Sequence, residues 1–196
     1  MAWLLGAGGI AALASYVYSN WDWYKNSARP DLAYLKAIKL KTLDGSGKEV
    51  MASDLWQNGG AVIMVEALEL SSLKPDLNQR GVNLVGVVHE EMGVKQFQPY
   101  LNSTIYLDKE KKFYGPEQRW MFLSGFLRPS VWKSLFRARG KGIEGNLKGE
   151  GRLLGGVFVV GPGEQGILLD HKEKEFGDKA DLQAVRDAVL KINSNN

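Results

Sequence analysis

Short apolar runs alternate with stretches of helical periodicity along most of the chain, from about residue 33 onward. The β-branched run Ala61–Val65 predicts a buried strand, and residues 82–88 predict a second one. Between them, leucines at positions 70, 73 and 77 recur at helical spacing and predict a helix over residues 66–79. This strand–helix–strand order predicts two parallel strands joined by a right-handed crossover.

The second half of the chain continues the alternation. The pattern predicts a short amphipathic helix over 94–101, a strand over 104–108 and a hairpin of strands 157–160 and 167–171. A closing helix is indicated by Leu182, Val185, Val189 and Ile192, which share one face. This order is that of an α/β, thioredoxin-like sheet flanked by helices, although it also suits another small mixed-sheet α/β fold.

The N-terminal segment, residues 1–24, differs from the rest. It holds an uncharged apolar run, residues 3–18, that ends in tyrosines and tryptophans. The run is shorter than the roughly 20 residues that span a bilayer, and no basic region precedes it. An apolar anchor helix, a helix that only touches a membrane and a cleaved leader all remain open. We therefore divide the chain into this segment, a domain over 25–192 and a polar tail over 193–196.

Composition excludes one class of chemistry. The 196 residues include no cysteine, so the chain has no disulfide, no thiolate metal site and no covalent thiol intermediate. The formal net charge is +3 and the isoelectric point is near 9.0, with both signs interleaved. This balance is only a weak argument for an anionic partner.

Three other features invite a chemical interpretation. His89 and His171 are the only histidines, and each stands at a predicted strand end beside acidic residues. A metal-binding or acid–base role is one interpretation. The favoured interpretation is that each lies at a solvated strand end. The glycine-rich segment 161–166 predicts a hairpin turn rather than a phosphate loop. From Arg119 to Lys141, aromatics alternate with bases; we expect the aromatics to pack inward and the bases to point outward. We predict no metal, no cofactor and no nucleic-acid partner.

Longer strings carry a specific resemblance. They are GAVIM at 60–64, DKEKKFYGP at 108–116, GNLKGEG at 145–151, LGGVFVVG at 154–161, QGILL at 165–169 and HKEKEFGDK at 171–179. Together they resemble the peroxiredoxin-like 2 family, subtype A, over residues 33 to 192 and in the right order. The resemblance implies a thioredoxin-like fold and an antioxidant, redox-regulatory protein whose redox site is a Cys-x-x-Cys.

By the same resemblance, the redox pair belongs after the strand Ala61–Val65, at the start of the next helix, where the helix terminus lowers a thiol pKa. Here Val65 is followed directly by Glu66, which matches the helix after the cysteines. The family pair would fall between Val65 and Glu66 and is absent, with a segment of roughly ten residues. A splice form or a gene-model error is favoured over an adaptive deletion. We therefore expect no catalytic residue and no thiol chemistry.

Two structural expectations follow from this loss. A strand-to-helix connection normally needs about 2 to 6 residues, so either the strand shortens or the first helical turn unwinds, with strain over residues 64–68. Gly155 and Gly156 also stand where thioredoxins usually carry a cis-proline. This departure argues against substrate binding of the thioredoxin type in this chain.

We expect a cytoplasmic protein, with membrane-associated and secreted forms as alternatives. The rival function is a non-enzymatic module that binds an unknown protein partner, or a membrane through residues 3–24.

Overall fold

The computed structural model describes residues 28–65, 69–91, 94, 103–119, 153–174 and 178–193. Residues 1–24, and all but Val94 of the helix predicted over 94–101, lie outside this part of the chain. The strands are β1 (Lys39–Thr42), β2 (Glu49–Met51), β3 (Ala61–Val65), β4 (Asn83–Val88), β5 (Thr104–Leu107), β6 (Gly156–Val160) and β7 (Ile167–Lys172). The α-helices are α2 (Leu32–Lys36), α3 (Lys74–Gln79) and α6 (Leu182–Leu190), and the 3₁₀ helices are η2 (Ala52–Leu55), η3 (Glu69–Leu73) and η4 (Lys112–Tyr114).

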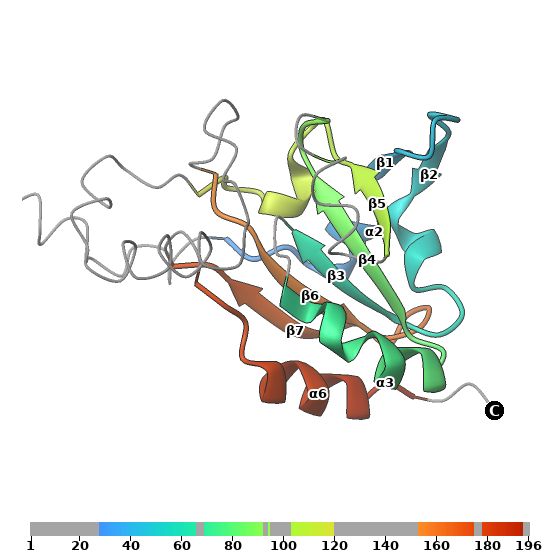
Figure 1. Cartoon of the computed structure of the whole chain (residues 1–196). Coiled ribbons are helices and arrows are strands. Elements are labelled where there is room, and N and C mark those ends of the chain that lie inside the picture. Colours follow the sequence, from blue (N-terminus) through green and yellow to red (C-terminus); the bar gives the residue numbers. More distant parts are fainter. Residues whose placement is uncertain are drawn as a thin grey trace, which may run out of the picture.

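All seven strands join one mixed sheet, in the order β2-β1-β5-β4-β3-β6-β7 (Figure 1). β3 pairs in parallel with β4, and β4 in parallel with β5, whereas β6 runs antiparallel to both β3 and β7. The predicted parallel pair and the predicted hairpin are therefore confirmed. Because β3 lies inside the sheet, its backbone groups are paired on both sides.

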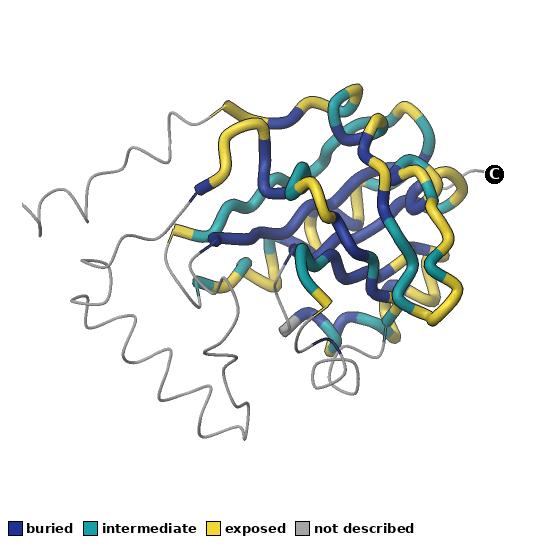
Figure 2. The backbone as a smooth tube through the Cα atoms, turned by 90° about the horizontal axis from the view of Figure 1, so that it is seen from above, coloured by how far each residue is buried: buried dark blue, intermediate teal, exposed yellow. Residues whose placement is uncertain are grey.

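Side chains of β3 alternate between two hydrophobic cores. Val62 and Met64 pack on the face covered by α3 and α6, whereas Ile63 and Val65 pack with residues of α2, η2 and η4 on the other face. All five residues of β3 are buried, as a central strand covered on both faces requires. Figure 2 shows the same arrangement, with buried backbone running through the middle of the molecule.

The helix after β3 differs from the prediction. The pattern predicted helix from Glu66, but the described helical structure begins with the 3₁₀ helix η3 and becomes α-helical only at Lys74. β3 meanwhile keeps its last residue, because Val65 pairs with Val87 on one side and Gly156 on the other. Shortening of the strand is therefore wrong: two rows of sheet hydrogen bonds hold Val65, while a helix end has no such constraint. Residues 66–68 lie outside the described part of the chain.

Other elements had no strong sequence signal. The side chain of Asp31 accepts a hydrogen bond from the backbone N–H of Tyr34 and caps α2, a single turn too short to show a period. β1 and β2 form a hairpin whose turn contains Gly45, at φ +92°. Within the part of the chain that the structure describes, no helix has the length and apolar character needed to cross a membrane.

Candidate site at the carboxyl edge of the sheet

Four strands end at one edge of the sheet. β3, β4 and β5 are mutually parallel. β3 and β7 are both antiparallel to β6, so β7 runs in the same direction as these three strands. Ligand sites in α/β sheets lie at such carboxyl edges. The edge is formed here by Val65, His89, Asp108 and Lys172, which end or directly follow these strands. We call it the carboxyl edge.

The centre of the carboxyl edge is the end of β3, where the family pair is expected. Val65 is 1% exposed and fully built into the sheet, and the next described residue is Glu69. Only three residues, 66–68, separate the strand from η3. The chain carries no thiol here or anywhere else.

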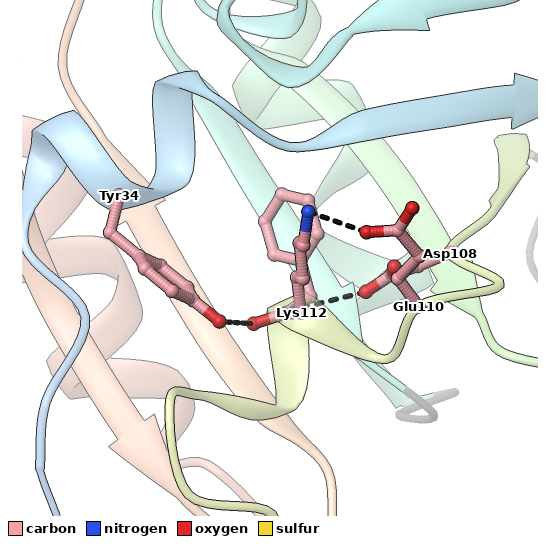
Figure 3. Close-up of polar contacts among 5 residues, drawn as sticks. Tyr34, Asp108, Glu110 and Lys112 are labelled. Atoms are coloured by element: carbon pink, nitrogen blue, oxygen red, sulfur yellow. Dashed lines mark hydrogen bonds and ion pairs between the residues drawn. The ribbon is translucent and has the colours of Figure 1, made fainter.

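A tight turn follows β5 and buries a carboxyl group. Asp108 is 0% exposed, and its Oδ2 accepts a 2.7 Å hydrogen bond from the backbone N–H of Phe113 (Figure 3). Burial raises the pKa of this carboxyl group, more than the hydrogen bonds from the backbone of Phe113 and Lys112 lower it. The turn is fixed further by Tyr34, whose hydroxyl donates to the carbonyl of Lys112, and by the left-handed backbone of Lys111 at φ +56°.

The same turn positions a tyrosine against the end of β4. Tyr114 is buried, and its hydroxyl lies 2.8 Å from Nδ1 of His89, with the two rings edge to face at 5.4 Å. His89 is thus half-buried and hydrogen-bonded. The expectation of a solvated strand end is wrong for this histidine, because η4 folds back over it.

A buried arginine holds the β6–β7 side of the edge. Arg119 is 3% exposed, and its guanidinium donates to the carbonyl oxygens of Glu173 (2.6 Å) and Gly155 (2.7 Å). In turn, the Glu173 carboxylate accepts a 3.0 Å hydrogen bond from the N–H of Gly155. The prediction that Arg119 points outward is wrong, because the backbone groups around the start of β6 need buried partners. The remaining bases of that stretch, up to Lys141, lie outside the described residues.

A small cavity adjoins this arginine. Its volume is ≈ 10 Å³, about the space of one water molecule. It is lined by Pro30, Phe113, Tyr114, Gly115, Arg119, Gly155, Gly156, Phe158, His171 and Lys172.

His171, in β7, is half-buried beside the cavity, so the prediction of a solvated strand end is wrong here too. Desolvation lowers its pKa, with nearby Arg119 acting in the same direction, so its ring is neutral at neutral pH.

These groups make polar contacts with one another and with the main chain. The described residues contain no cluster of three or more histidines or acids arranged to hold a metal ion. The sequence analysis singled out both histidines but missed Asp108, Tyr114 and Arg119 as parts of one edge. A signal existed for Asp108, because it is the last residue of the strand predicted over 104–108, whose end belongs to this edge. None existed for Arg119, which stood among many bases.

Comparisons with known proteins agree with this fold. A family model described as AhpC/TSA antioxidant enzyme matches residues 69–175. The chain is 50% identical to Peroxiredoxin-like 2A of Bos taurus over 208 residues, covering 97% of this chain and 94% of that protein. It is 48% identical to Peroxiredoxin-like 2A of Homo sapiens over 205 residues, covering 97% of this chain and 90% of that protein. Both alignments are longer than the 196-residue chain, so this chain lacks residues that the relatives have.

A similarity to solved structures is much weaker. The bacterioferritin comigratory protein of Xanthomonas campestris is 14% identical, with a TM-score of 0.47, over 84% of this chain and 94% of that chain. The assignment rests instead on the family model and on the identity to the vertebrate relatives over nearly the whole chain. The chain therefore belongs to the peroxiredoxin-like 2A family, as a member without cysteine.

Proposed function

We propose that this chain is a redox-inactive form of an antioxidant, redox-regulatory protein of the cytoplasm. In this proposal it keeps the scaffold of the family and performs no thiol peroxidase or disulfide exchange reaction. The observation that carries the proposal is the complete absence of cysteine in a chain whose sheet is intact. Reduction of a peroxide by such a protein needs a thiolate that becomes a sulfenic acid, and no other side chain replaces it in that reaction.

The location of the loss supports the same proposal. β3 is buried and paired through Val65, and η3 begins at Glu69, so the connection between them is three residues long. The relatives align over more residues than this chain contains, which fits the loss of a segment rather than the replacement of two cysteines. We infer that the missing segment is the one between Val65 and Glu66.

Peroxide turnover tests the proposal directly. The purified full chain is incubated with hydrogen peroxide and an excess of dithiothreitol, and consumption of peroxide is followed over many molar equivalents. We expect the same rate as with a heat-treated sample. A peroxide-dependent oxidation of the reductant clearly above that of the heat-treated control would show that the proposal is wrong.

A matched pair of insertions keeps this test informative. A family segment with the Cys-x-x-Cys that the resemblance implies is placed between Val65 and Glu66 in one variant, and the same segment with both cysteines changed to serine in the other. We expect turnover only from the cysteine form. If both forms are silent although folded, the redox site does not belong at this junction.

Sequencing the transcripts that span the codons of Val65 and Glu66 separates the origins of the loss. A longer transcript of the same gene that encodes the cysteines identifies this chain as a splice form or an incomplete gene model.

A further inference from the structure

An asparagine–glycine pair stands in the turn that leads into β3. Asn58 is followed directly by Gly59, and it is the only asparagine of the chain that has a glycine after it. The turn spans residues 56–59, and Asn58 is exposed in it. Glycine has no Cβ, so the main-chain nitrogen of Gly59 can approach the side-chain amide carbon of Asn58 with little obstruction. The pair therefore meets the chemical requirement for spontaneous deamidation.

Packing keeps a glycine at position 59. A Cβ on Gly59 would lie 1.9 Å from the carbonyl oxygen of Gly81, a separation at which the main chain must shift. Asn58 is exposed instead, so water reaches its side chain. The fold thus requires the glycine of this pair and leaves the amide before it open to solvent.

The reaction consumes only water. The main-chain nitrogen of Gly59 attacks Cγ of Asn58, a C–N bond forms, and the bond from Cγ to the amide nitrogen breaks. That nitrogen leaves as ammonia and takes the proton of the Gly59 N–H. Water then opens the resulting succinimide at one of its two carbonyls. Opening at Cγ gives aspartate, whereas opening at the main-chain carbonyl gives isoaspartate, in which the main chain runs through the former side chain.

The isoaspartyl product lengthens the main chain where it is closely fitted. It adds one carbon–carbon bond, about 1.5 Å, directly before Gly59. The next residue, Gly60, is fixed on both sides: its N–H donates to the carbonyl of Trp56 (3.3 Å), and its carbonyl accepts from the N–H of Asn83 (3.0 Å). A longer chain displaces Gly59 and Gly60 from these contacts.

We propose that Asn58 is a site of spontaneous deamidation in the folded chain and that its isoaspartyl product destabilises the amino end of β3. This modification site does not depend on the proposed function, because Asn58 precedes β3 whereas the missing segment follows it.

The pair Asp44–Gly45 provides an internal comparison. Its ring closure expels water and proceeds from the protonated carboxyl group. Hydrogen bonds from Ser46 lower the pKa of Asp44, so this group is ionised at neutral pH and closure is disfavoured. Among the described residues, no atom lies within 4 Å of a Cβ built on Gly45, so a longer chain is accommodated there. We expect this pair to react more slowly and with less effect on stability.

Ageing of the purified full chain tests the site. The chain is kept at neutral pH and physiological temperature, and isoaspartate is mapped by proteolysis and mass spectrometry with a fragmentation that distinguishes it from aspartate. We expect isoaspartate to accumulate at position 58 before it appears at Asp44 or at Asn78, which is also exposed but lies in α3 and is followed by Gln79. Isoaspartate that forms at position 58 only in the urea-unfolded chain overturns the proposal.

Two variants separate the reaction from its effect on stability. Asn58→Gln keeps an exposed amide but needs a larger ring to close, so we expect its urea midpoint to survive ageing unchanged. Fresh Asn58→Asp has the charge of the product without the longer main chain, and we expect its midpoint to stay close to that of the parent chain. The isoaspartyl fraction separated from aged parent chain should unfold at lower urea than both variants. An isoaspartyl fraction as stable as Asn58→Asp overturns the proposed destabilisation.

Discussion

The two ends of the central strand β3 are built in different ways. At its amino end, backbone lies against backbone: a Cβ on Gly59 would be 1.9 Å from the carbonyl oxygen of Gly81, and a Cβ on Gly60, at φ +78°, would be 2.9 Å from that of Val160. At its carboxyl end, the buried Arg119 donates to the carbonyl of Gly155, next to the pair of Val65 and Gly156, and the buried Asp108 follows β5 at the same edge of the sheet. The amino end is specified by shape, and the carboxyl end by hydrogen bonds.

This difference bears on the proposed loss of a redox site from an intact sheet. Val65 is held by pairing with Val87 and Gly156, and neither contact involves the segment that would follow it. The polar groups of the carboxyl edge come from β7 and from the segments that follow β4, β5 and β7. A scaffold arranged in this way tolerates a deletion at the end of β3, whereas a change at its amino end disturbs the close approach of neighbouring backbones.

The largest effect is expected from Gly59→Ala, because the added carbon would lie 1.9 Å from the backbone carbonyl oxygen of Gly81 and the main chain must shift to admit it. We expect a loss of about 3 kcal/mol in the free energy of unfolding, measured by urea denaturation. The control is Gly163→Ala, where φ is +55° and the space is open, with an expected cost of about 1 kcal/mol. Equal stability of the two variants would contradict a tightly fitted amino end.

At the carboxyl end, Arg119→Met should cost about 2 kcal/mol of unfolding free energy, because it removes the guanidinium hydrogen bonds to the carbonyls of Gly155 and Glu173, and the Gly155 carbonyl then keeps only its hydrogen bond from the N–H of Glu173. Arg80→Met, at an exposed arginine, should change stability by less than about 0.5 kcal/mol. Urea midpoints measure both. If the two substitutions have the same effect, the hydrogen bonds of Arg119 do not stabilise the edge.

Lengthening the connection between β3 and η3 should raise stability slightly, by about 1 kcal/mol, because a longer loop allows α-helical hydrogen bonds in place of the poorer 3₁₀ geometry. The serine form of the family segment, placed between Val65 and Glu66, avoids any thiol effect. A segment of equal length inserted after Gly45 is the control and should cost about 0.6 kcal/mol. An unchanged urea midpoint in the first variant would show that the short connection between β3 and η3 does not destabilise the domain.

The smallest effect concerns pH. The pKa of Asp108 is raised by burial, so its contribution to stability is complete below the pKa of the unfolded chain, about 3.9, and is lost as pH rises through the folded value. Asp108→Asn cannot ionise and should gain stability relative to the parent chain as pH increases from about 3 to 7. The measurement is the urea midpoint of both proteins across this range.

Asp44→Asn provides a control of opposite sign. The hydroxyl of Ser46 lowers the pKa of Asp44, so its contribution is present above the unfolded pKa and lost as pH falls. The Asp44 variant should therefore lose stability relative to the parent chain as pH increases. The same slope for both variants would argue against a raised pKa of Asp108.

Much of the fold follows from local pattern. The apolar run Ala61–Val65 and the hairpin of β6 and β7 are visible because strands buried on both faces are continuously hydrophobic, and the glycine-rich turn at 161–166 joins antiparallel strands. The absence of cysteine, and its consequence for thiol chemistry, is likewise a property of the sequence alone. Short elements such as α2 and β2 are not predicted, because a few residues are too few to show a helical or strand period.

The grouping of residues at the carboxyl edge could not be predicted from local sequence pattern. Asp108, Tyr114, Arg119 and His171 are separated by up to 63 positions, and only the strand order of the sheet brings them to one edge. Arg119 shows the limit most clearly: its composition and neighbours predict an exposed base, and burial is decided by carbonyl groups of Gly155 and Glu173, which come from distant parts of the chain. Sequence determined which chemistry this protein lacks, whereas tertiary structure decided which polar groups remain together, because hydrogen bonds between distant segments depend on where the fold places them.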